Sequence, residues 1–216
     1  IGDVGRSRDL EKVAAGASGH CGILLRPMSS LAARLAELDA EVLFDTASRG
    51  RYSTDASIYQ VQPIGVVVPR NEEAARAAIA IAAEQGVPIL PRGAGSSQCG
   101  QTVGEALVID HSKYLARVLE IDEQAGTALV QPGVVLDALN ASLRSRGLWF
   151  PVDVSTSAQA TIGGMAGNNS CGSRSIEYGN MVHNVLAIDA VTAAGKRWRF
   201  GPMEDAAGEY GDFVKK

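Results

Sequence analysis

Apolar residues recur at helical spacing in three stretches of this 216-residue chain, and each stretch predicts an amphipathic helix. The first has its apolar stripe at Leu31, Leu35, Leu38 and Val42, with Ser29 or Ser30 placed to cap its start. The second, residues 72–85, ends at Gly86, and the third, residues 134–146, ends at Gly147. The polar, turn-rich segment 44–62 predicts a loop, which is either solvated or lies over a ligand.

Short β-branched or alternating runs predict strands at residues 64–68, 87–90, 107–110, 118–122, 127–131, 186–193 and 196–200. The first two flank the second helix as a strand-helix-strand unit, and ligands usually lie beyond the carboxyl ends of such strands. The runs at 118–131 and at 186–200 predict hairpins. Hairpins mixed with a few helices predict an α+β fold of two lobes, with mixed or antiparallel sheets flanked by helices.

Composition narrows the class of protein. Hydrophobic residues make up 46% of the chain and charged residues 20%, which is typical of a folded domain. The net charge of −4 gives no basic surface and argues against a nucleic-acid partner. No apolar run is long enough to span a membrane and no signal peptide is visible, so we expect a cytoplasmic protein. The chain begins at Ile1, and we expect it to be a piece of a larger polypeptide.

Cysteine and histidine residues suggest no site of their own. The three cysteines are widely spread, which favours neither a disulfide framework nor a zinc site. We expect Cys99 and Cys171 to be small buried residues. His20, His111 and His183 lack metal-ligand spacing, so we expect them to be surface or internally hydrogen-bonded residues.

A glycine-rich stretch, residues 88–101, connects the second predicted strand to the third. Because glycine reaches positive φ at low cost, successive N–H groups of such a loop can form a concave surface for phosphate oxygens. The dinucleotide fingerprint fails here because Gln98 stands at its third glycine. The P-loop fails because Gln101 stands at its lysine. A diphosphate cradle and an ordinary flexible surface loop both remain open.

A second loop region, residues 151–179, is rich in glycine, serine and asparagine. Thr161 can cap a short helix whose first turn holds Gly163 and Gly164, and this arrangement predicts unpaired N–H groups that face an anion.

The motifs in this order resemble the FAD-binding domain of the vanillyl-alcohol oxidase superfamily, also called the PCMH type. They are PRGAGSSQCG at 91–100, VQPGV at 130–134, TIGG at 161–164 with NN at 168–169, YG at 178–179 and VLAID at 185–189. The nearest branch resembles D-lactate dehydrogenase and the flavin-binding subunit of glycolate oxidase, including their fusions to iron-sulfur modules. The resemblance covers about residues 52–200.

The resemblance implies which residues hold FAD. The first loop would bind the pyrophosphate through Pro91, Arg92, Gly93, Ala94, Gly95, Ser96, Ser97, Gln98, Gly100 and Gln101. The adenosine would lie near Pro132, Gly133, Val185 and Ile188. The flavin ring and ribityl chain would lie near Pro151, Asp153, Ser155, Ser157, Thr161, Ile162, Gly163, Gly164, Asn168, Tyr178 and Gly179. Some members attach flavin through a histidine at the position of Ser96, so the serine here implies noncovalent FAD.

The resemblance also implies an FAD-dependent oxidoreductase that acts on CH–OH groups, oxidising a 2-hydroxy acid such as D-lactate or glycolate by hydride transfer to flavin. We expect a lead-in with a helix at 1–50, the FAD-binding domain at 51–201 and a tail at 202–216 leading to a substrate-binding region outside this chain. That region would supply the base, so no catalytic residue is named here and the isolated chain is expected to be nearly inactive. The electron acceptor would be an iron-sulfur module or a cytochrome, and peripheral attachment at the inner membrane follows by analogy. Two alternatives stay open: a flavin domain serving another alcohol or a sugar lactone, and a non-catalytic module that has lost its cofactor.

Overall fold

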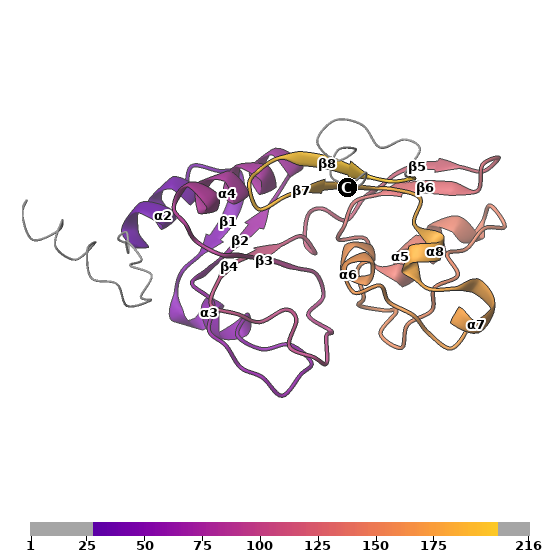
Figure 1. Ribbon diagram of the computed structural model, residues 1–216, viewed down its shortest axis with the longest axis horizontal. Coiled ribbons are helices and arrows are strands. Elements are labelled where there is room, and N and C mark those ends of the chain that lie inside the picture. The colour runs from indigo at the N-terminus through magenta and orange to yellow at the C-terminus, as the bar shows by residue number, and fades with distance from the viewer. Residues whose placement is uncertain (1–27, 203–216) are drawn as a thin grey trace, which may run out of the picture.

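The computed structural model describes residues 28–202, which form two lobes side by side (Figure 1). The first lobe holds a four-stranded sheet of order β1-β2-β4-β3. Its strands are β1 (Ala40–Leu43), β2 (Gly65–Pro69), β3 (Ile89–Arg92) and β4 (Leu107–Asp110). β2, β4 and β3 run parallel, while β1 pairs antiparallel with β2.

Helices α2 (Met28–Leu35) and α4 (Glu72–Glu84) cover one face of this sheet, and the short α3 (Thr46–Arg51) follows β1. The core between helices and sheet contains Leu35, Val67 and Leu107, each fully buried. Val66 and Val108 are buried on the opposite face. Because β2 and β4 are covered on both faces, their sequences are continuous apolar runs rather than alternating ones.

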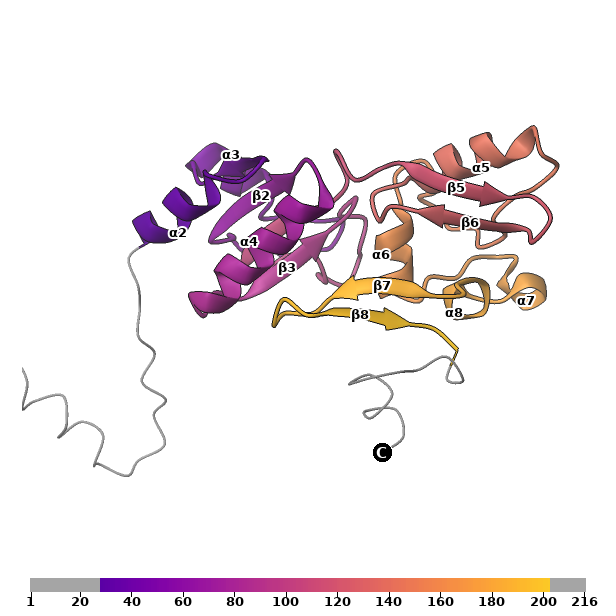
Figure 2. The ribbon, with the colours of Figure 1, turned by 90° about the horizontal axis from the view of Figure 1, so that it is seen from above.

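The second lobe contains the antiparallel hairpin β5 (Val118–Asp122) and β6 (Thr127–Val130), which packs with α5 (Leu136–Arg144). Three short helices complete it: α6 (Ile162–Gly167), α7 (Ser175–Tyr178) and α8 (Met181–Asn184). Of these, α6 lies nearest the first lobe (Figures 1 and 2).

The hairpin β7 (Ile188–Val191) and β8 (Arg197–Phe200) connects the lobes. It starts after α8 and extends alongside the first lobe (Figure 2). There Val191 packs against the core beneath α2 and α4. No helix of the described part is long and apolar enough to cross a membrane.

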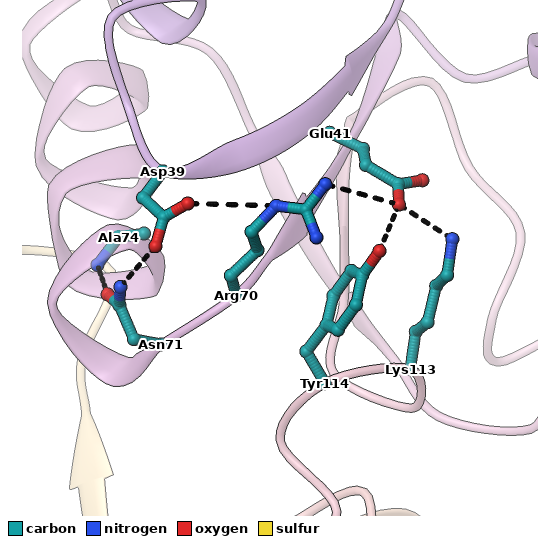
Figure 3. A network of polar contacts seen from close by, with 7 residues as sticks. All are labelled: Asp39, Glu41, Arg70, Asn71, Ala74, Lys113 and Tyr114. Carbon is teal, nitrogen blue, oxygen red and sulfur yellow. Dashed lines mark hydrogen bonds and ion pairs between the residues drawn. The ribbon is translucent and has the colours of Figure 1, made fainter.

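A network of polar side chains joins β1 to the segments after β2 and β4 (Figure 3). Glu41 accepts hydrogen bonds from Lys113, at 2.6 Å, and from the Tyr114 hydroxyl. These two bonds lower the pKa of the Glu41 carboxyl. Arg70 lies 3.8 Å from Glu41 and stacks on the Tyr114 ring at 4.6 Å. The network therefore fixes the antiparallel edge strand to the parallel core of the sheet.

The predicted α+β class and all the predicted strands and hairpins are confirmed, with shifts of one or two residues at their ends. The first predicted helix is too long, because α2 ends at Leu35 and Val42 lies in β1, where it faces Val67. Its predicted caps are also wrong, because α2 begins at Met28, before Ser29 and Ser30. The predicted loop at 44–62 contains α3, capped by Asp45, whose carboxylate accepts the Ser48 N–H at 2.9 Å.

The domain limits at residues 50 and 201 stay predictions, although β1, from the predicted lead-in, belongs to the first sheet. The expectations for residues 1–27 and 203–216 lie outside the described residues.

Candidate functional site

The glycine-rich loop leaves β3 at Arg92 and returns to β4, so it lies at the carboxyl end of a parallel strand. Gly95 has φ +69°, and the Ser97 hydroxyl accepts the N–H groups of Cys99 and Gln101 at 3.2 and 3.4 Å. Within residues 28–202, the N–H groups of residues 93–98 have no hydrogen-bond partner. A run of unpaired N–H groups beside a positive-φ glycine suits the oxygens of a diphosphate.

The two loops predicted as the site meet at the junction of the lobes. A side chain on Gly93 would overlap the Thr161 hydroxyl at the start of α6. The Gln101 side chain donates to Asn168 Oδ1 at 3.0 Å. The Gly133 N–H donates to the Leu115 carbonyl at 2.7 Å, which joins the turn before α5 to the segment after β4. The structure therefore brings together residues of the first loop, Gly133, Thr161 and Asn168.

The start of α6 differs from the prediction. Thr161 caps the helix as predicted, because its hydroxyl accepts the Gly164 N–H at 3.3 Å. However, Ile162 donates to Val134 O at 2.8 Å and Gly163 donates to Pro132 O at 2.8 Å. The predicted unpaired N–H groups are therefore already bonded inside the protein, because the chain before α5 passes alongside them. Anion binding through these N–H groups is not supported.

Other predicted site residues hold the second lobe together. The Asp153 carboxylate accepts the Ser173 hydroxyl at 2.8 Å and the Arg174 N–H at 3.0 Å, and these bonds lower its pKa. Tyr178 packs edge-on against Trp149, with ring centroids 5.2 Å apart. The remaining predicted residues lie on the segment before α6, at Pro151, Ser155 and Ser157, around α7 and α8, at Gly179 and Val185, and on β7, at Ile188. Their contacts with a cofactor stay predictions.

A cleft of about 440 Å³ adjoins the first loop, on the face of the sheet away from α4. Gly93 and Ala94 line it together with Tyr52, Asp110 and Lys113. Asp110 is buried and accepts the Tyr52 hydroxyl at 2.6 Å. Burial, and then this hydrogen bond, raises the pKa of Tyr52, so the phenol stays protonated and donates. Neither Tyr52 nor Asp110 was predicted as a site residue, because only the fold brings positions 58 residues apart into contact.

His111 directly follows β4 and was wrongly expected to be a surface or internally bonded residue. Its Nδ1 atom is buried and has no hydrogen-bond partner among the described residues. Its backbone N–H donates to the Arg92 carbonyl at 3.0 Å, and its own carbonyl touches Gly133. Burial lowers the pKa of the imidazole, although Asp110 acts in the opposite direction. A neutral histidine therefore lies at the lobe junction.

This burial predicts a pH dependence of stability. Because the folded-state pKa lies below the unfolded value of about 6.5, the unfolded chain binds the proton more readily. The contribution of His111 is complete above the unfolded pKa and is lost as the pH falls through the folded pKa. Urea unfolding at pH 7.5 and 5.5 should show a smaller loss of stability in His111→Gln than in the unchanged chain. An equal loss in both proteins would contradict the buried, neutral state.

The expectations for His183 and for the two loop cysteines have different outcomes. His183 is internally bonded, since its Nδ1 accepts the Asn180 N–H at 3.0 Å. Cys99 and Cys171 are both exposed, so their predicted burial is wrong; short polar loops leave their side chains uncovered. In the described ranges no group of histidine, cysteine and acidic residues could hold a metal ion.

Comparison with solved structures shows the fold. A Physcomitrella patens BBE-like 1 variant matches with a TM-score of 0.69 at 23% identity, covering 79% of this chain and 37% of that one. An alkyldihydroxyacetonephosphate synthase matches with a TM-score of 0.68 at 22% identity, covering 80% and 34%.

Relatives found by sequence comparison have higher sequence identity to this chain than these solved structures do. A D-2-hydroxyglutarate dehydrogenase of Pseudomonas putida is 36% identical over 170 residues, covering 77% of this chain and 17% of the relative. The glycolate oxidase subunit GlcD of Bacillus subtilis is 39% identical over 171 residues, covering 76% and 36%. A probable mitochondrial D-lactate dehydrogenase of Danio rerio is 33% identical, covering 73% and 32%. The chain thus spans well under two thirds of the length of these relatives.

A family model described as an FAD binding domain matches residues 63–201. This match includes both loops and the junction between them, and it confirms the resemblance to the vanillyl-alcohol oxidase superfamily and the assignment of FAD as cofactor. The chain belongs to the family of FAD binding domains.

Proposed function

We propose that this chain is the FAD-binding part of a flavin-dependent dehydrogenase that oxidises a 2-hydroxy acid. The observation that carries the proposal is the run of N–H groups at residues 93–98 that are unpaired within residues 28–202, with Gly93 close to Thr161 at the start of α6, in a chain of the FAD binding domain family. The names of the relatives support the substrate class, since they include enzymes of 2-hydroxyglutarate, glycolate and lactate.

The residues of this chain would act by binding and orienting the cofactor. The N–H groups of the first loop would hold the diphosphate, and Ser96 would leave the flavin noncovalently bound. Residues around α6 to α8 would border the flavin ring. When bound, FAD accepts the hydride of the substrate.

The base that takes the hydroxyl proton and the groups that bind the substrate carboxylate are expected outside this chain. We therefore propose that the isolated chain binds FAD without efficient turnover. The acceptor for the electrons would be an iron-sulfur module or a cytochrome.

Anaerobic reduction of the bound flavin tests the substrate class. Two proteins are loaded with FAD: the chain, and a longer polypeptide that includes the substrate-binding region. Separate samples of each are mixed with D-lactate, glycolate, D-2-hydroxyglutarate, an aryl alcohol or a sugar lactone. We expect one of these acids to bleach the flavin in the longer polypeptide and little bleaching in the short chain. The L-enantiomers of lactate and 2-hydroxyglutarate serve as matched controls. Bleaching only by an aryl alcohol or a sugar lactone would overturn the substrate assignment.

A further inference from the structure

Arg92 is the last residue of β3, where the glycine-rich loop leaves the strand, but its guanidinium group turns back onto the protein. Nη1 donates to the backbone carbonyls of Tyr52 and Thr102, at 3.2 and 3.1 Å, and Nη2 donates to the Thr54 carbonyl at 2.8 Å. The group also stacks on the Tyr52 ring at 5.3 Å. The fixed fork of donors in arginine is suited to hold several acceptors at once. One side chain therefore holds carbonyl groups from two segments that are distant in sequence.

Further bonds join the same two segments. The Ala56 N–H donates to the Gly95 carbonyl at 3.1 Å. The Asp55 carboxylate accepts the Thr102 N–H at 3.4 Å and the Thr102 hydroxyl at 3.0 Å. Residues 52–57, which we call the clamp segment, thus lie against the glycine-rich loop along several of its residues.

Arg92 also supports the turn at Gly95. A side chain on Gly95 would lie 2.5 Å from Nη2 and 3.0 Å from the central carbon of the guanidinium group. The guanidinium group therefore fills the space beside the one residue of residues 93–98 that has a positive φ. Moving it would release both the turn and the clamp segment.

We propose that Arg92 is a positioning residue, which keeps residues 93–101 in the shape that binds the diphosphate by fastening the clamp segment to them. The inference rests on the proposed FAD function and deepens it. Arg92, which the sequence placed among the cofactor contacts, acts through backbone carbonyls. Ordering of the clamp segment and binding of FAD are coupled, because a loop held in its binding shape loses less entropy when the ligand arrives.

Substitutions of Arg92 separate this role from a direct contact. We expect Arg92→Met and Arg92→Lys each to weaken FAD binding by about tenfold or more. This factor corresponds to the loss of one hydrogen bond to a charged group. A lysine ammonium keeps the charge but lacks the fork. The measurement is a titration by flavin fluorescence at a temperature where circular dichroism shows each variant folded. Arg76→Met, on the exposed side of α4, is the control and should bind FAD as the unchanged chain does.

A double-variant cycle tests the clamp segment itself. Asp55→Ala removes a second attachment between the same segments. If both residues act through the clamp segment, Asp55→Ala combined with Arg92→Met weakens binding by less than the product of the two single effects. An effect equal to the product would overturn the shared mechanism.

Two further results would overturn the inference. Full recovery of FAD affinity in Arg92→Lys would show that charge alone matters, as in a direct diphosphate contact. Unchanged FAD affinity in variants with a lowered melting temperature would show a purely structural role. If the unchanged chain binds no FAD, the proposed function fails instead. Hydrogen exchange of the Ala56 amide then tests, without FAD, whether Arg92 holds the clamp segment in place. Exchange must be faster in Arg92→Lys than in the unchanged chain, and an unchanged rate shows that Arg92 does not hold the clamp segment.

Discussion

A chain carrying Gly95→Val should lose FAD on desalting, with an affinity reduced on the order of 100-fold or more. Holding a β-branched residue at φ +69° costs about 1 to 3 kcal/mol, which alone is roughly fivefold to 150-fold in affinity if the loop must take up this shape to bind. The new Cβ would also lie 2.5 Å from the Arg92 guanidinium group. The measurement is the flavin-to-protein ratio after incubation with FAD and desalting, followed by a titration.

Gly126→Val is the matched control for this result. Gly126 lies in the β5–β6 turn with φ +65°, and a side chain there would meet no atom of residues 28–202 within 4 Å. This variant carries similar backbone strain, so it should lose stability yet retain FAD. Equal FAD retention in the two variants would show that the conformation of Gly95 is not needed for cofactor binding.

Gly133→Ala should destabilise the chain and weaken FAD binding together. The added methyl group would overlap the His111 carbonyl and lie 2.7 Å from the Leu115 carbonyl. Because both obstacles are backbone atoms, the segments must separate, at a cost of roughly 1 to 3 kcal/mol. The lobe junction would shift with them. Urea unfolding gives the stability loss, and flavin fluorescence gives the affinity.

Gly50→Ala tests whether the effect of Gly133→Ala is steric. Gly50 lies inside α3, where an added methyl group would meet no atom of the described part of the chain within 4 Å. Alanine is the better helix former, so this variant should gain roughly 0.5 to 1 kcal/mol. A Gly133→Ala variant as stable as the unchanged chain would contradict the close contact between Gly133 and the segment after β4.

The sequence predicted the helices, strands and turns that depend on the local pattern of apolar and turn residues. Its predictions hold for the apolar runs of β2 and β4 and for the helix ends at Gly86 and Gly147. These features depend on periodicity and on turn residues that are close together in the sequence. β1 and α3 were missed for a physical reason. β1 has four residues and is formed by pairing with β2, and α3 is a polar segment of six residues that its Asp45 cap defines.

The site was predicted less completely, because the sequence gives residue types but not contact partners. A glycine in the sequence indicates that its backbone lies close to some other group, but it does not say which group. In the folded chain Gly93 lies close to Thr161, and Gly133 lies close to His111. Thr161 was correctly predicted as a cap, but the pairing of the α6 N–H groups with Val134 and Pro132 depends on how two distant segments pass. The hydrogen bonds between Arg92 and the clamp segment likewise form only in the folded chain.

We propose that this chain holds FAD noncovalently at the junction of its two lobes. Visible absorption of the purified chain after incubation with FAD and desalting, followed by acid precipitation, tests it most directly. We expect a yellow protein that releases its flavin into the supernatant. Colour in the acid pellet would contradict noncovalent binding, and a folded but colourless chain would contradict FAD binding.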